Sequence, residues 1–170
     1  MTNPQYGNAG NVGDILKHAG LCALADAVRD AVERPTPVHY VETHAFLLHA
    51  LLPNPAAWRG EVEARRARWP AYGTYVQIER PWVERGRYRC SSGLVLGRVP
   101  AVRLHLAEKD PETRALLREQ LTAEGVEPVQ LVEDGRHHPD RVGQTTPGAL
   151  LGLVDPFEAP DPFWPAVEGL

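Results

Sequence analysis

The chain has 170 residues, of which 43% are hydrophobic and 24% charged, enough for one domain with its own core. A formal net charge of −4 excludes a general attraction to nucleic acid, so any RNA contact needs a local basic patch. The absence of a leader or a membrane-spanning apolar run, and the two cysteines (Cys22 and Cys90) without metal-ligand spacing, predict a cytoplasmic protein.

The first predicted helix starts at Asn11 or Asp14, since either residue is a good N-cap, and it ends before Pro35. Lys17 and His18 are neighbours near its start. The common fate of such a pair is a solvated lysine beside a half-buried histidine. The alternative is that both side chains are offered to a cofactor or a phosphate group.

The first strand is predicted at residues 38–42, and Thr43 and His44 follow at its carboxyl end. This is where a sheet of the α/β class places a cofactor-contacting loop. A nucleotide-type cofactor normally requires glycines in that loop. Residues 46–48 are Phe-Leu-Leu instead, which counts against a standard cofactor loop.

Residues 45–92 interrupt the alternation of strands and helices and are predicted to form an inserted helical, basic subdomain within a single domain of residues 1–170. From Trp58 to Cys90 there are eight arginines and four glutamates, a local net charge of 8 − 4 = +4. Arginines interleaved with aromatic rings suit an RNA surface, whereas Glu61 and Arg65 at i,i+4 suit an ordinary solvated helix. Both interpretations stay open. The candidate RNA contacts in this segment are Arg65, Arg66 and Arg68, and its rings include Trp58, Tyr72, Tyr75 and Trp82.

Regular alternation returns after the insertion. Strands are predicted at residues 102–107, 128–132 and 148–155, and a helix starts at Asp110 and Pro111 and runs to Gly125. The last strand is a short, wholly apolar run, which is typical of a buried strand in a parallel sheet. The pattern therefore predicts an α/β fold with a doubly wound sheet.

An acidic residue lies at or just past the carboxyl end of each of the last three predicted strands: Glu108, Asp134 and Asp155. The carboxyl ends of parallel strands line one crevice. An acid after the second strand is placed to bind ribose hydroxyls, and Asp134 with Gly135 suits the edge of an adenine. Three acids in register favour a cofactor that contains a nucleoside.

The final strand ends in Asp155, Pro156 and Phe157. Together a carboxylate, a proline carbonyl and an aromatic ring suit a planar amine, because the two oxygens accept its hydrogens while the ring stacks on the base. Taken alone, an Asp-Pro pair after an apolar run is more often a strand that ends in a turn.

These segments resemble, in order along the chain, the large-subunit ribosomal RNA adenine-N6 methyltransferases of the RlmJ type. The N-terminal decapeptide is the most specific match. The matching segments are Ala9–His18, Glu42–Ala45, Tyr88–Ser92, Glu108–Pro111, Asp134–Gly135 and Asp155–Glu158.

The resemblance implies a Rossmann-like fold, S-adenosylmethionine as cofactor, and methyl transfer to the N6 amine of an adenine in 23S ribosomal RNA. That adenine has to leave its stacked context, and the transfer needs no metal. The resemblance also implies that Asp155 is the catalytic residue and that Lys17, Pro156 and Phe157 lie on the RNA side. The implied cofactor contacts are His18, His44, Ser91, Glu108, Asp134, Gly135 and Asp155.

Two differences from the family support an alternative function, a catalytically degenerate methyltransferase-like module that binds RNA or a protein. The glycine turn after the first strand is replaced, and the catalytic motif has one proline where the family has two. The chain also stops soon after the fourth strand, so the C-terminal strands of such methyltransferases are expected to be missing. We expect either a truncated chain or a homodimer that covers the edge of the fourth strand.

Overall fold

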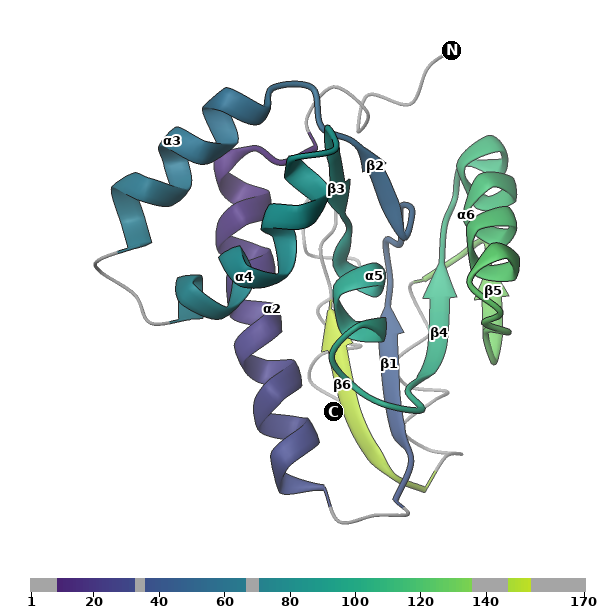
Figure 1. Ribbon diagram of the computed structural model, residues 1–170. Helices are drawn as coiled ribbons and strands as arrows, with labels where there is room; N and C mark the ends of the chain where they lie inside the picture. Colours follow the sequence, from purple (N-terminus) through teal and green to yellow (C-terminus); the bar gives the residue numbers. More distant parts are fainter. Residues whose placement is uncertain (1–8, 33–35, 67–70, 136–146, 154–170) are drawn as a thin grey trace.

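The computed structural model describes residues 9–32, 36–66, 71–135 and 147–153, apart from the side chains of residues 66 and 71. This part of the chain is a mixed α/β structure built on a parallel sheet of four strands (Figure 1). The predicted α/β class with a parallel sheet is therefore confirmed, and it is consistent with a Rossmann-like fold.

The strand order in this sheet is β5-β4-β1-β6. In chain order these strands are β1 (Val38–Glu42), β4 (Arg103–Ala107), β5 (Gln130–Val132) and β6 (Ala149–Leu153). Each matches a strand predicted from the sequence to within two residues at its start. The first strand is central, because two parallel neighbours cover its edges, and all five of its residues are buried.

The described helices are α2 (Val12–Ala31), α3 (Pro55–Arg66), α4 (Ala71–Val83), α5 (Ser91–Leu96) and α6 (Pro111–Ala123). Between β1 and β4, the chain also forms an antiparallel pair of short strands that was not predicted from the sequence. Its strands are β2 (His49–Leu51) and β3 (Arg87–Arg89). None of the described helices has the length and apolar character needed to cross a membrane.

The helix starts follow local capping chemistry. Asn11, rather than Asp14, is the N-cap of α2, because its side chain accepts a 3.0 Å hydrogen bond from the Asp14 backbone N–H. The Asp14 carboxylate accepts in turn from the backbone N–H of Gly10 at 3.0 Å. Asp110 caps α6 in the same way, with Pro111 at the first helical position as predicted.

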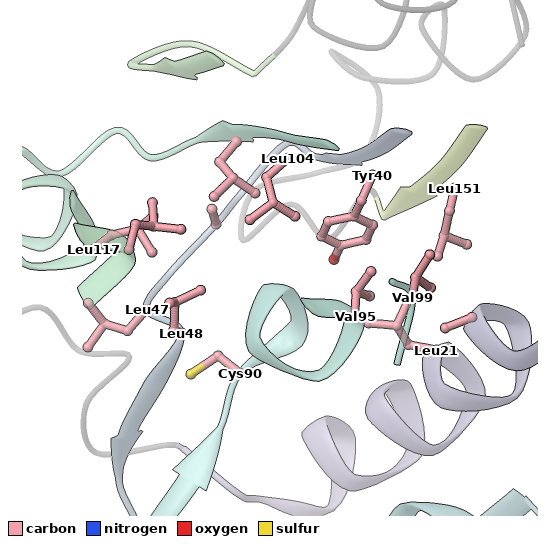
Figure 2. Packing of buried hydrophobic residues seen from close by; sticks show 14 of the residues in the cluster. Leu21, Tyr40, Leu47, Leu48, Cys90, Val95, Val99, Leu104, Leu117 and Leu151 are labelled. Atoms are coloured by element: carbon pink, nitrogen blue, oxygen red, sulfur yellow. The ribbon is translucent and has the colours of Figure 1, made fainter. Parts of the chain in front are cut away.

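The main core lies on one face of the parallel sheet. Tyr40 pairs in register with Leu104 on one side and Leu151 on the other, so these three side chains point to the same face. Figure 2 shows the side chains that pack around them from α2, α5, α6 and the loops: Leu21, Leu47, Leu48, Cys90, Val95, Val99 and Leu117. On α6, Leu117 is buried in this core, whereas its neighbour Leu116 is exposed.

A second core lies within the insertion, where α3 and α4 pack against α2 and β3. Trp58, Tyr72 and Tyr75 are all buried in it. The interpretation of these rings as an RNA-stacking surface is therefore wrong. Their aromatic area stabilises the insertion instead, since rings of this size dominate the energetics of a small core. Trp82 is the remaining ring of the predicted set, and it is half-buried.

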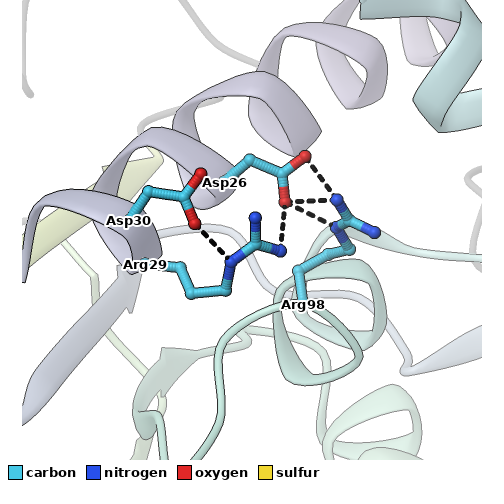
Figure 3. A network of polar contacts seen from close by, with 4 residues as sticks. All are labelled: Asp26, Arg29, Asp30 and Arg98. Carbon is cyan, nitrogen blue, oxygen red and sulfur yellow. Dashed lines mark hydrogen bonds and ion pairs between the residues drawn. The ribbon is translucent and has the colours of Figure 1, made fainter.

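An ion-pair network joins α2 to the segment after α5 (Figure 3). Arg98 donates to Asp26 through Nε at 2.8 Å and also through its terminal nitrogen. Arg29 donates to the same carboxylate at 2.8 Å and to Asp30 at 2.8 Å. The shared carboxylate of Asp26 orients two guanidinium groups and thereby fixes α5 against α2, next to the core face of β1.

Candidate functional site

The carboxyl ends of the parallel strands lie together at one edge of the sheet, the carboxyl edge. The turn after β1 crosses this edge. Thr43 donates its backbone N–H to the carbonyl of Leu153 in β6 at 3.2 Å, and Ala45 donates to Ala107 in β4 at 2.7 Å. The turn therefore lies between the ends of two neighbouring strands. His44 is half-buried at its centre, with its Nδ1 2.8 Å from the hydroxyl oxygen of Thr43.

The residues that replace the expected glycine turn have a structural role. Leu47 and Leu48 are buried in the main core, and Phe46 packs against it. These three residues connect the turn at the carboxyl edge to the start of β2. The turn itself forms with Ala45 buried beneath it and without a glycine.

Glu108 follows β4 at the same edge and is buried. Its backbone N–H donates to Val132 of β5 at 2.9 Å, and its carboxylate accepts from the backbone N–H of Asp110 at 2.7 Å. Burial raises the pKa of Glu108 to about 7, partly offset by the Asp110 N–H. Near neutral pH this carboxyl group is therefore present in both protonation states and is able to accept or donate a hydrogen bond to a hydroxyl group.

Asp134 and Gly135 follow β5. Asp134 is exposed, whereas Gly135 is buried against the turn after β1. A Cβ atom at Gly135 would lie 2.2 Å from the carbonyl oxygen of Thr43. Only a residue without a side chain fits there, so the loop after β5 rests on the backbone of the turn. The structure thus brings together the turn that carries His44, Glu108 and the Asp134–Gly135 pair.

A second group of predicted residues meets in a buried hydrogen-bond chain. His18 of α2 has Nδ1 2.5 Å from the Tyr88 hydroxyl and Nε2 3.1 Å from the Ser91 hydroxyl. Tyr75 donates to Tyr88 at 3.3 Å, and the Trp58 indole N–H donates to Tyr75 at 3.0 Å. Because an indole nitrogen only donates, the chain runs from Trp58 toward His18, which then accepts at Nδ1 and donates from Nε2 to Ser91.

The imidazole of His18 is neutral in this chain. Burial, and next the charge of Lys17, hold the pKa of His18 well below its ordinary value. A neutral ring is required by the donor order, since Nδ1 has to accept. The family resemblance selected His18 and Ser91, whereas Tyr75 and Trp58 were noted only as rings of a possible RNA surface. A buried hydrogen-bond chain leaves no signal in a single sequence, because its members are 13 to 73 residues apart.

The two groups are linked through Cys90, which precedes Ser91. Burial raises the pKa of the Cys90 thiol, a hydrogen bond with the Leu47 backbone lowers it, and the carboxylate of Glu42 at the end of β1 raises it to a smaller extent. Helix α5 packs against β1. Its position is fixed by a 3.0 Å hydrogen bond from the Cys90 N–H to the carbonyl of Leu48.

The other predicted contacts are dispersed. Lys17 forms an ion pair with Asp14 at 3.2 Å. Arg65 bonds Glu61 one helical turn away, as the solvated-helix interpretation predicted. Arg66 ends α3, and its side chain lies outside the described residues, as do Arg68, Asp155, Pro156 and Phe157. Among the residues that the structure describes, no group of three His, Cys, Asp or Glu side chains is arranged to hold a metal ion.

The fold is similar to the crystal structure of a Legionella pneumophila protein, LPL1258, assigned to the family DUF519. The TM-score is 0.73 at 20% sequence identity, and the match covers 95% of this chain. The chain spans 64% of the length of that protein. No protein-family model and no curated protein matches the sequence. Similarity at this level of identity shows the fold alone.

Proposed function

We propose that the chain is an S-adenosylmethionine-dependent methyltransferase that acts on the N6 amine of an adenine in 23S ribosomal RNA. The observation that carries the proposal is the grouping at the carboxyl edge. There the turn of Thr43 and His44, the buried Glu108 and the Asp134–Gly135 pair meet in a sheet of order β5-β4-β1-β6. Such an edge is where open α/β sheets bind their ligands.

The residues present fit an adenosine-containing cofactor. Glu108, with a pKa of about 7, suits the hydroxyl pair of a ribose, and the exposed Asp134 suits the amine edge of the cofactor's adenine. Gly135 keeps the backbone open where a side chain would collide with Thr43. His44 lies in the turn beside them. When bound, the cofactor supplies an electrophilic methyl group on a sulfonium sulfur.

Asp155 is the proposed catalytic residue, and it follows the end of β6 by two residues. Its carboxylate accepts one hydrogen bond from the target amine, the Pro156 carbonyl accepts a second, and Phe157 stacks on the base. The support for these three roles is the sequence motif. Catalysis then comes mostly from positioning the amine and from polarising it.

A second candidate is a methyltransferase-like module that binds RNA or protein without catalysis. The burial of Leu47 and Leu48, where the family has its glycine turn, favours it. The two functions differ in whether the chain binds the cofactor.

The first test titrates S-adenosylhomocysteine, the demethylated product, into the protein calorimetrically. The wild type is expected to bind, and Gly135→Ala to bind at least about tenfold more weakly, because the added methyl group displaces the Thr43–His44 turn. Gly152→Ala in β6 is the control, since a Cβ atom there meets nothing within 4 Å. An absence of heat from the wild type at millimolar ligand would support the binding module instead.

The second test compares methyl transfer to protein-free 23S ribosomal RNA by the wild type and Asp155→Asn. Asparagine keeps the shape of the side chain but loses the charge, and charge-assisted hydrogen bonds are roughly twice as strong as neutral ones. We expect turnover to fall about a hundredfold, with RNA affinity nearly unchanged because phosphate contacts dominate binding. If Asp155 only ends the strand in a turn, asparagine is a good substitute and both proteins will incorporate methyl groups equally.

A further inference from the structure

The outer face of the β2–β3 pair carries arginines held against a tryptophan. The arginine–tryptophan cluster consists of His49, Trp82, Arg85, Arg87 and Arg89. The guanidinium carbons of Arg85 and Arg89 lie 5.3 and 5.4 Å from the centre of the Trp82 ring. The His49 ring lies 5.3 Å from the same indole, tilted by 30°. These cation–π contacts fix the directions of the guanidinium groups.

Two of these arginines also bond the C-terminal turns of α4, and one of them is paired with a buried carboxyl group. Arg85 donates to the carbonyl of Pro81 at 2.8 Å, and Arg89 donates to that of Ile78 at 2.9 Å. Cations are favoured at this end of a helix. Arg89 is further paired with the buried carboxylate of Glu79. The guanidinium group of Arg89 therefore already has an acidic partner within the protein.

Arg85 and Arg87 keep their charge. Neither forms an ion pair with a carboxylate within the described part of the chain. The side chain of Arg87 donates to His49 Nδ1 at 2.7 Å. Burial, and then the charge of Arg87, lower the pKa of His49, whereas Glu124 raises it to a smaller extent. The imidazole is thus a neutral acceptor that orients Arg87 without cancelling its charge.

The strand register places these groups on one surface. His49 pairs with Arg89, and Leu51 pairs with Arg87, so all four share the outer face of the pair. The intervening Ala50 and Tyr88 are buried on the other face. Leu51 is 71% exposed. Arg85 joins this surface through its contact with Trp82. The surface therefore combines the exposed Arg85, the half-buried Arg87 and an exposed apolar side chain, in a chain whose net charge is negative.

This surface lies next to the carboxyl edge. Figure 1 shows β2 and β3 beyond the carboxyl ends of β1, β4 and β6. Gln120 of α6 holds β2 there, because its side chain accepts from the backbone N–H groups of Leu48 and His49 and donates to the His49 carbonyl at 3.0 Å. A polynucleotide whose target base enters the carboxyl edge would pass over it.

We propose that the outer face of the β2–β3 pair binds the phosphate backbone of the RNA substrate, with Arg85 and Arg87 as the phosphate contacts. Leu51 contacts a sugar or base beside them. The inference rests on the proposed function and assigns phosphate contacts other than the predicted Arg65, which is already paired with Glu61. Because the guanidinium groups are held in place before binding, little side-chain freedom is lost when phosphates bind.

The test measures binding of protein-free 23S ribosomal RNA over a series of salt concentrations. The test variant is Arg85→Glu with Arg87→Glu, and the control is Arg103→Glu with Arg118→Glu. The control sites are exposed, lie at the start of β4 and on α6, and give the same change in net charge. Loss of two phosphate contacts should reduce the salt slope by about 1.4, at about 0.7 per phosphate for a single strand. We expect at least a tenfold loss of affinity at low salt.

Three results would overturn the inference. Equal losses in the test and control variants would show a general charge effect. An unchanged slope in Arg85→Gln with Arg87→Gln, which removes the charges without reversing them, would show that neither group contacts phosphate. If the wild type binds no RNA, the face does not bind an RNA backbone, and a protein partner becomes the better candidate. The titration with S-adenosylhomocysteine is independent of the cluster, so it separates failure of this inference from failure of the proposed cofactor site.

Discussion

Replacing Gly93 by alanine is expected to lower the free energy of unfolding by about 3 kcal/mol, because the helix that carries it rests directly on backbone. A Cβ atom at this position would lie 2.1 Å from the carbonyl oxygen of Leu48 and 3.0 Å from its carbonyl carbon. That carbonyl also accepts the hydrogen bond from Cys90, and Gln120 holds the Leu48 N–H. The carbonyl therefore cannot shift without breaking contacts on both sides.

Chemical denaturation of Gly93→Ala and Gly20→Ala measures this effect. Gly20 lies in α2, and a Cβ atom there meets nothing within 4 Å. The control should be stabilised by about 0.5–1 kcal/mol, since alanine is a better helix former than glycine. Similar gains in both variants would mean that α5 does not rest on Leu48.

Removing the carboxylate of Glu79 is the second change with a large expected effect. Glu79 of α4 is fully buried, and its carboxylate accepts from the Arg89 backbone N–H at 3.0 Å and from Arg89 Nε at 3.2 Å. Alanine would leave a largely buried guanidinium group and a strand N–H without their acceptor. We expect a loss of about 3 kcal/mol in the free energy of unfolding. The exposed Glu84→Ala, just past the end of α4, should change it by less than about 0.5 kcal/mol.

The pH dependence gives a further check on Glu79. Burial raises its pKa from an ordinary value of 4.5 to about 7, although Arg89 opposes the shift. The stability contributed by the protonated carboxyl is complete below pH 4.5 and is lost as the pH rises through 7. Glu79→Gln lacks this titration, whereas Glu108 titrates in both proteins. The stability of the wild type relative to the glutamine variant should therefore fall between pH 5 and pH 8. A constant difference would place the pKa of Glu79 outside this range.

The features that the sequence predicted well depend on near neighbours in the chain. Asparagine and aspartate caps bond N–H groups only three residues away, as at Asn11 and Asp110. Short apolar runs predicted the four parallel strands, and each predicted first residue lies within two residues of the observed one. Once these strands are parallel, their carboxyl ends meet at one edge, so the positions of Glu108 and Asp134 followed from the pattern.

The features that the sequence did not predict depend on distant partners. An alternation of arginines and rings has the same appearance whether the rings face solvent or another helix. For Trp58, Tyr72 and Tyr75 the packing of α3 and α4 on α2 decided the outcome. The β2–β3 pair joins residues nearly 40 positions apart, and its three-residue strands are too short for a periodic signal.

The sequence by itself therefore determined the parallel α/β sheet and the edge at which its acidic residues gather, because capping and strand alternation are local properties. Only the tertiary structure decided how the arginines are used. Arg65 and Arg89 are paired with the carboxyl groups of Glu61 and Glu79, whereas Arg85 and Arg87 contact Trp82 and His49 and have no carboxylate partner within the described residues. The physical reason is that the charge available to a ligand depends on which groups the fold brings within bonding distance, and those groups come from separate elements of the chain.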